Sequence, residues 1–327
     1  MGGFILRRLA TSIPLIAVAS FLVFCLVAVS GDPLAEMREN PSITEEQVQD
    51  RREALGLDEP VLTRYAKWVG NAVTGDLGRS YEDNEEVSSK LWRSIGVTLR
   101  LLVVAVLLAV VVGVFIGVVA ALRQYSKFDY LATFFAFVFF SMPVFWLAAV
   151  LKDVGIRVND ALGYRFFETV GEQDPSLPDS AGFITVWGDR LSHLILPVMT
   201  LVLIQVAAWS RYQRASMLDV LNADYVRTAK AKGLSPGKVI MRHTLRNALI
   251  PILTLVAIDF GLLMSGAVIT ETVFGWQGMG RLLVGALTEY DANVVQGWLL
   301  VSAFMVIVFN LVADILYGYL DPRIRRA

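Results

Sequence analysis

The chain has few residues that bind metals or form covalent cross-links. It contains one cysteine, Cys25, and two histidines, His193 and His243, among 327 residues. A lone cysteine cannot form an intrachain disulfide, and two widely separated histidines do not have the spacing of metal ligands. The sequence therefore indicates neither a disulfide framework nor a metal site.

The sequence also lacks the motifs of common catalytic and nucleotide sites. HExxH does not occur in it, and the single stretch that fits GxSxG, residues 233–237, follows no predicted strand. Residues 233–238 resemble a phosphate-binding loop, but one residue is missing between the glycines and Val239 follows the lysine where Ser or Thr is required. We expect no catalytic residue, no metal and no cofactor in this chain.

Charge is sparse and apolar residues are abundant. Charged residues make up 18% of the chain, hydrophobic residues make up 55%, and the mean hydropathy is +0.57. Soluble domains are about 45–50% apolar. Six apolar runs are long enough to cross a hydrocarbon core of about 30 Å. They are 9–29, 95–122, 131–151, 191–209, 248–270 and 297–320.

Near-continuous apolar runs of this length predict membrane helices, because barrel strands alternate apolar and polar residues. The first run, 9–29, follows Arg7 and Arg8 like a signal peptide, but it is longer than the 7–15 residues of a secretory apolar region. We expect it to be retained. The predicted fold class is an all-α polytopic membrane protein with six transmembrane helices.

The distribution of lysine and arginine predicts the orientation in the membrane. With the N-terminus inside, the inner segments hold fifteen Lys/Arg and four acids; they are 1–8, 123–130, 211–247 and 321–327. The outer segments hold thirteen Lys/Arg and twenty-four acids; they are 30–94, 152–190 and 271–296. We therefore expect both termini on the cytoplasmic side.

The first outer segment, 30–94, is too long to be a simple connection. Its sequence predicts helices at 43–55, with Ser42 or Thr44 as N-cap and Gly56 as the stop, and at 61–73. The segment is either a solvated cap or a platform for an extracytoplasmic partner, and its composition favours neither.

Residues 211–247 form the most basic segment, with eight Lys/Arg and two acids between two apolar runs. Asn222 or Asp224 can cap a helix over 225–232, and Gly233 suits the left-handed residue that follows a helix. Ser235 and Pro236 then predict a second short helix that runs toward Leu245. The tether to the membrane disfavours DNA binding. Contact with anionic lipid and docking of a soluble protein remain, and we favour docking.

Three further features concern the membrane interior. Asp259, near the middle of the fifth run, is either a pathway residue or a buried acid paired with a neighbour such as Gln205. Phe274 and Trp276, near several glycines, suggest a constriction on the outer side, or an interfacial anchor at Trp276. Gly113 and Gly117 form a GxxxG pattern that permits close packing of helices, and we expect this packing to be within the chain.

Several stretches carry the resemblance to a known family. The segment 225–233, Tyr-Val-Arg-Thr-Ala-Lys-Ala-Lys-Gly, is similar to the EAA loop of ABC-importer permeases. In this loop Arg227 and Thr228 stand where the general pattern has Glu and the first Ala. Other matching stretches are Arg8-Leu9, 31–33, 55–60, Tyr65 with Trp68, 75–80, 271–274, 280–283 and 320–325. The chain resembles the B-type permease subunit of dipeptide and oligopeptide importers over nearly its whole length.

This resemblance implies the type I ABC-importer permease (MetI-like) fold, as a single transmembrane domain 1–327 that includes the outer segment 30–94 and the loop 211–247. It implies a bacterial cytoplasmic membrane protein with a second homologous permease, two ATPase subunits that hold ATP and Mg²⁺, an extracytoplasmic substrate-binding protein and a peptide substrate. The residues implied to dock the ATPase are Tyr225, Arg227, Thr228, Ala229, Lys230, Ala231, Lys232, Gly233 and Leu234.

Other functions remain open from the sequence. The same family includes permeases for nickel or other small solutes. An ion-coupled secondary transporter would use Asp259 as its ion relay, and a scaffold protein would need no transport pathway.

Overall fold

The computed structural model describes residues 2–40, 42–178, 182–264 and 267–320. Helices dominate these residues, and the described part of the chain contains no strand beyond an isolated bridge between Arg79 and Glu86. The helices are α1 Gly2–Ser30, α2 Ala35–Glu39, α3 Glu45–Ala54, α4 Val61–Val73, α5 Val87–Leu122, α6 Lys127–Ser141, α7 Val144–Leu162, α8 Phe183–Leu221, α9 Asp224–Ala231, α10 Pro236–Lys238, η1 Val239–Leu245, α11 Arg246–Met264, α12 Val268–Phe274, α13 Met279–Thr288 and α14 Ala292–Leu320.

Five helices among the described residues are long and apolar enough to cross a membrane. The qualifying stretches are Ile13–Ser30, Val87–Leu122, Phe183–Leu221, Pro236–Leu263 and Ala292–Val312. The bent pair α6 and α7 makes a sixth if it counts as one span. The prediction of an all-α polytopic membrane protein with up to six spans is confirmed.

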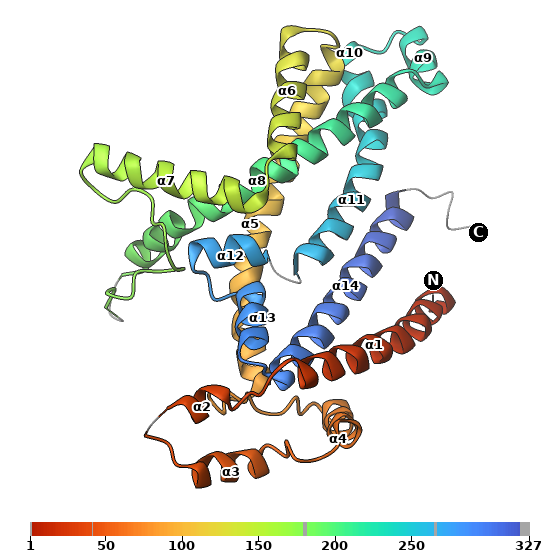
Figure 1. Cartoon of the computed structure of the whole chain (residues 1–327). Coiled ribbons are helices and arrows are strands. Elements are labelled where there is room, and N and C mark those ends of the chain that lie inside the picture. The colour runs from red at the N-terminus through yellow and green to blue at the C-terminus, as the bar shows by residue number, and fades with distance from the viewer. Residues whose placement is uncertain (1, 41, 179–181, 265–266, 321–327) are drawn as a thin grey trace. The chain divides into compact units, whose positions relative to one another are not determined.

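The run 131–151, which was expected to form one transmembrane helix, is broken within its length. Two helices cover this run, α6 and α7, and their axes are bent by 106° at the break (Figure 1). Pro143 lacks a backbone N–H and forces the preceding residue out of the helical region, and Met142 accordingly has φ −75° and ψ 129°. The apolar composition gave no sign of the break, because proline can also sit within a span.

The chain divides into two compact units, which we describe separately. Unit 1 comprises Met1–Thr98, Met264–Val268 and Gln277–Ile307. Unit 2 comprises Leu99–Leu263, Ile269–Trp276 and Val308–Ala327.

In unit 1, the first polar segment contains the two predicted helices, and the first of them is capped by side chains. Thr44 caps α3 in a capping box with Gln47, and Gly56 follows α3 with φ +64°, as the sequence predicted; the alternative cap Ser42 is not used. The helix expected over 61–73 is present as α4. Its residue Tyr65 packs against Phe21 and Phe24 of α1, with ring centroids 5.2 and 5.4 Å away. This aromatic cluster holds α4 against α1.

A buried carboxylate fixes the loop that precedes α5 in unit 1. Asp291 is 1% exposed, and its Oδ2 accepts hydrogen bonds from Ser80 Oγ at 2.6 Å and Tyr81 N at 2.7 Å. Its Oδ1 accepts from Val294 N at 3.1 Å. Because each donor is satisfied by one buried acid, residues 80–81 are tied to the start of α14.

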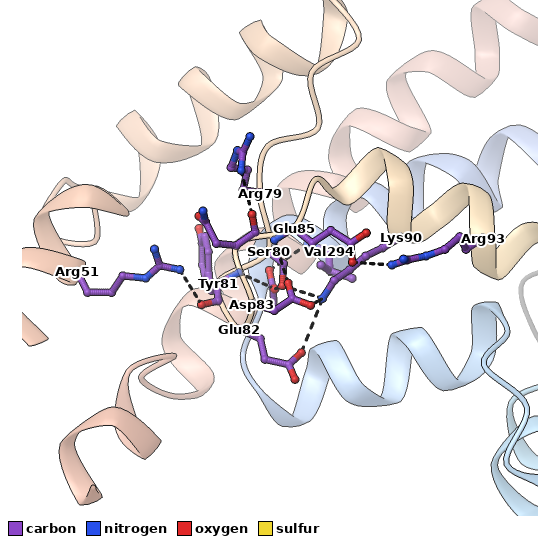
Figure 2. A network of polar contacts seen from close by, with 12 residues as sticks. Arg51, Arg79, Ser80, Tyr81, Glu82, Asp83, Glu85, Lys90, Arg93 and Val294 are labelled. Carbon is purple, nitrogen blue, oxygen red and sulfur yellow. Dashed lines mark hydrogen bonds and ion pairs between the residues drawn. The ribbon is translucent and has the colours of Figure 1, made fainter. Parts of the chain in front are cut away.

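Lysine and arginine side chains of α5 also bind residues of this loop (Figure 2). Lys90 Nζ lies 2.8 Å from Asp83 Oδ2 and 3.0 Å from Ser80 Oγ. Arg93 Nη2 lies 2.5 Å from Glu85 Oε2. Burial raises the pKa of the Asp83 carboxyl, but the hydrogen bonds from Lys90 and from the backbone of Glu85 outweigh burial and leave this pKa lowered.

In unit 2, α5 and α8 approach closely at the GxxxG pattern. A Cβ atom on Gly117 would lie 2.6 Å from the carbonyl oxygen of Ser210, and one on Gly113 would lie 3.4 Å from Cβ of Trp209. Larger residues at Gly117 would therefore separate the helices. The expectation of packing within the chain is confirmed.

Candidate functional site

The basic segment forms a helical turn between α8 and α11. The helix α8 continues to Leu221, so residues 211–221 belong to it and the connection itself begins at Asn222. At about 1.5 Å per residue, the 39 residues of α8 extend about 58 Å, well beyond the hydrocarbon thickness. The far end of α8 therefore presents α9 away from the apolar part of the helix (Figure 1).

The predicted roles of Gly233 and Pro236 in the turn are confirmed. Gly233 has φ +75°, a conformation that L side chains rarely adopt. Pro236 occupies the first turn of α10. We define residues 224–245, from the start of α9 to the end of η1, as the elbow.

The expected side-chain caps are wrong, and the second helix is not a separate short helix. The N-cap of α9 is Ala223, so neither Asn222 nor Asp224 caps it with a side chain. Ser235 precedes α10 but its hydroxyl makes no capping hydrogen bond. The second helix does not stop near Leu245, because α10 continues through the π-helical segment η1 into α11. Movement of the elbow can therefore pass directly into a membrane helix.

A small apolar cluster seats α9 on η1. Val226 is 0% exposed, and it is buried together with Ala229 and Val239, with Val220 of α8 packed against them. Ala229, one of the residues implied to dock the ATPase, is therefore not exposed to a partner, because its methyl group lies in this cluster. Ala231 is exposed, and a partner can approach the helix there.

The outward surface of the elbow carries most of the cations. Six of the eight basic residues counted in 211–247 are exposed; they are Arg227, Lys230, Lys232, Lys238, Arg242 and Arg246. Arg227 has an acidic neighbour in Asp224, 3.7 Å away, but both side chains are largely in solvent, at 71% and 99% exposed. Thr228 and Leu234 are also exposed, and Tyr225 Oη accepts a hydrogen bond from Asn247 at 3.1 Å.

The other two cations hold α8 to α6. Arg214 donates to both oxygens of Asp129 at 2.6 and 2.7 Å, and the carboxylate of Asp129 is buried. Arg211 lies over the rings of Phe137 and Phe140, with its Cζ 4.7 and 4.5 Å from their centroids. These contacts were missed by the sequence interpretation, which counted both arginines as loop charge. The helical continuation of α8 was the signal that could have separated them from the loop.

The mid-span acid has a different neighbour from the expected one. Asp259 Oδ2 accepts a hydrogen bond from Trp209 Nε1 at 2.8 Å, whereas no hydrogen bond joins it to Gln205 in the described structure. The suggested Asp259–Gln205 pair is therefore wrong, and the general expectation of a polar neighbour on α8 is right. A role for Asp259 or Gln205 in the transport pathway stays a prediction.

Comparison with known proteins identifies the family. Residues 113–326 match the family described as binding-protein-dependent transport system inner membrane component, and residues 1–102 match the N-terminal part of such membrane components. The chain belongs to this family.

Individual relatives cover the permease from end to end. The oligopeptide transport system permease protein OppB of Mycobacterium tuberculosis is 42% identical, over 99% of each chain. The dipeptide transport system permease protein DppB of Escherichia coli is 38% identical, over 98% of each chain. The inward-facing MetNI methionine ABC transporter has a chain with a TM-score of 0.55 and 16% identity, covering 71% of this chain and 96% of its own.

These findings establish the MetI-like permease fold and a multi-pass membrane subunit. They favour an ABC-importer permease over an ion-coupled secondary transporter. They also agree with the expectation that the subunit itself is not catalytic. The docking residues of the elbow are not tested by them and stay predictions.

The two aromatic residues suggested as an outer gate of the permease are buried in unit 2. Phe274 is buried, and its carbonyl oxygen accepts from Gly171 N at 2.8 Å. Trp276 is also buried and lines a cavity of about 420 Å³ together with Val103, Trp187 and Leu194. Burial of the indole argues against the alternative of an interfacial anchor, and the gate stays a prediction.

Proposed function

We propose that this permease is the membrane subunit of an ATP-driven importer of dipeptides or oligopeptides. The proposal is supported by relatives at 37–42% identity whose names specify oligopeptide, dipeptide or di/tripeptide transport. Nothing in the described structure favours nickel or another small solute over a peptide.

The observation that carries the coupling mechanism is the seated elbow. The short helix α9 buries Val226 and Ala229 against η1 and leaves its cations outward. A soluble ATPase subunit with an acidic cleft would contact this surface without disturbing the apolar cluster of Val226, Ala229 and Val239. Because α9 packs on η1 and η1 continues into α11, force applied to α9 would reach a membrane helix through this packed contact.

The remaining subunits follow from this role. A second homologous permease would complete the transport pathway, and two ATPase subunits would bind ATP and Mg²⁺ on other chains. An extracytoplasmic binding protein would deliver the peptide. Anionic lipid would contact the exposed cations of the elbow only as a minor interaction beside the ATPase. In the bacterial cytoplasmic membrane both termini and the elbow would lie inside, and no contact with nucleic acid is expected.

Transport would proceed by alternating access. ATP-driven closure of the ATPase subunits would pull the two elbows of the permease pair, and hydrolysis would reset them. Nucleotide can shift the two states only through a difference in its affinity for them.

Cysteine crosslinking tests the proposal directly. Since Cys25 is the one native cysteine, a Cys25→Ser background allows a single new cysteine at Lys230, or at Lys67 of α4 as a control. We expect Lys230→Cys to crosslink to an ATPase subunit in the assembled complex and Lys67→Cys not to do so. A Lys230→Cys variant that transports peptide but crosslinks only to lipid would contradict docking at the elbow.

A further inference from the structure

Unit 1 contains a polar pocket that the proposed transport cycle does not use. It has a volume of about 340 Å³ and is lined by parts of α1, α3, α4, the loop before α5 and the start of α14. Cationic, amide and indole groups from α4 share its wall, namely Arg64, Lys67, Trp68 and Asn71. The pocket is large enough to admit a small organic group.

Trp68, which lines this wall, carries a buried N–H donor that has no partner among the described residues. Trp68 is 7% exposed, and its Nε1 makes no hydrogen bond within the described residues. The indole is held in place by stacking on Tyr65, with ring centroids 6.4 Å apart, and Tyr65 Oη in turn donates to the carbonyl oxygen of Ala17 at 3.2 Å. An unsatisfied buried donor costs about 1–3 kcal/mol, so an acceptor that reaches it would be bound favourably.

The guanidinium of Arg64 lies one helical turn from Trp68 on the same face of α4. Its Cζ is 5.8 Å from the centroid of Phe24, and its Nη2 donates to Tyr81 Oη at 3.4 Å, a long hydrogen bond. Burial raises the pKa of Tyr81, although the contact with Arg64 acts in the other direction, and the phenol therefore stays neutral. No carboxylate lies within ion-pairing distance of Arg64 among the residues that the structure describes.

The neighbouring cation differs in this respect. Lys67 Nζ is paired with Glu59 Oε1 at 2.5 Å, so its charge is already neutralised. Asn71, which also lines the pocket, has an exposed side-chain amide that can donate a further hydrogen bond. Glu53 adds one negative charge to the wall, which disfavours a multiply charged anion such as phosphate.

We propose that this pocket binds a single carboxylate group through Arg64 and Trp68. A planar carboxylate can accept two hydrogen bonds from a guanidinium and a further one from the indole N–H. The terminal carboxylate of a free short peptide and an acidic side chain of a protein partner offer the same chemistry. The proposal does not depend on docking at the elbow, because none of its residues belongs to unit 2.

Calorimetric titration of the purified transporter complex, without a binding protein, tests the pocket. The probes are alanyl-alanine and its C-terminal amide, which differ in the terminal carboxylate, and N-acetyl-glutamate amide and N-acetyl-glutamine amide, which differ in a side-chain carboxylate. We expect Arg64→Gln to weaken carboxylate binding about tenfold or more, and Trp68→Phe to weaken it several-fold while keeping the ring. Arg38→Gln is the matched control, because Arg38 is ion-paired with Asp32 at 3.0 Å and does not line the pocket, and its affinity is expected to stay within about twofold of wild type.

The probes separate the two sources of the carboxylate. Tighter binding of alanyl-alanine than of its amide, lost in Arg64→Gln, supports a free peptide as ligand. A preference only for N-acetyl-glutamate amide over N-acetyl-glutamine amide supports an acidic side chain of a partner. Equal affinity for acids and amides in wild type, or unchanged binding in both Arg64→Gln and Trp68→Phe, would overturn the proposal. Co-purification of the ATPase subunits, measured in parallel, reports on the elbow independently.

Discussion

The elbow and the loop before α5 are both rich in charged residues, but they use these charges differently. In the loop, Lys90, Asp83 and Ser80 bond to one another, and Asp291 is satisfied by three donors. In the elbow, five cations are exposed, and an apolar cluster packs α9 on η1. Charges that are paired within the chain stabilise local structure, whereas unpaired exposed charges remain available to a partner.

Arg64 shows that paired and unpaired charges can lie next to each other in one segment. It lies in the same segment as the well-paired Lys67, three positions along α4, but no acid neutralises it within the described residues. A high count of charges in a segment therefore does not tell which of them are structural.

The largest effect is expected from Gly233→Val, which attacks the elbow. A β-branched residue at φ +75° is strained by more than the roughly 1–2 kcal/mol that an L residue costs in this region. We expect peptide uptake by reconstituted transporter to fall below about a tenth of wild type, with ATP hydrolysis no longer stimulated by substrate. Gly237→Ala is the control, because a Cβ there meets nothing within 4 Å and the helix tolerates it. Normal coupled uptake by Gly233→Val would refute a rigid elbow.

The Asp291→Ala variant should destabilise the loop before α5 and leave the elbow unchanged. It leaves the buried donors of Ser80 and Tyr81 without an acceptor, and we expect a loss of about 3 kcal/mol in the stability of this loop. Hydrogen exchange of residues 76–93 measures it, and Glu82→Ala, which removes only an exposed contact 3.8 Å from Lys90, is the control. If ATPase affinity fell as much as loop protection, the two regions would not be independent.

The double variant Lys230→Glu with Lys232→Glu should weaken the elbow's contact with the ATPase and leave the loop before α5 intact. Both side chains are exposed and outside the apolar seat, so we expect normal thermal stability and about tenfold weaker binding of the ATPase subunits. Affinity measured at low and high salt checks the electrostatic origin, since screening should reduce the difference. The charge reversal Arg157→Glu, on the exposed surface of α7, should leave binding unchanged.

The smallest effect concerns the pH dependence of the loop. The lowered pKa of Asp83 means that its contribution to stability is present above the unfolded pKa of about 4 and is lost as pH falls through the folded value. Because the side chain is 46% exposed, the contribution is below about 1 kcal/mol. Loop hydrogen exchange, corrected for intrinsic rates, should show a larger loss of protection between pH 6 and pH 3 in wild type than in Asp83→Asn. Identical losses in the two proteins would remove Asp83 as the titrating group.

Much of the fold could be predicted where one physical term dominates. Long apolar runs predict spanning helices because the backbone must satisfy itself in lipid. The left-handed turn at Gly233 and the capping box at Thr44 also follow from local chemistry alone. The family resemblance rested on such stretches together, and the comparison with relatives confirmed it.

Tertiary structure decided the features that depend on partners distant in the sequence. Asp129 pairs with Arg214 across 85 positions, and Asp259 bonds to Trp209 rather than to Gln205, because packing of α6, α8 and α11 determines which side chains meet. The 106° bend at Pro143 is of the same kind, since proline permits a break but neighbouring helices set its angle. Hydropathy alone indicates which helices are apolar enough to cross a membrane, and backbone sterics alone place the turn at Gly233. Which charges are neutralised and which stay open to a ligand was decided only when the folded helices brought them together.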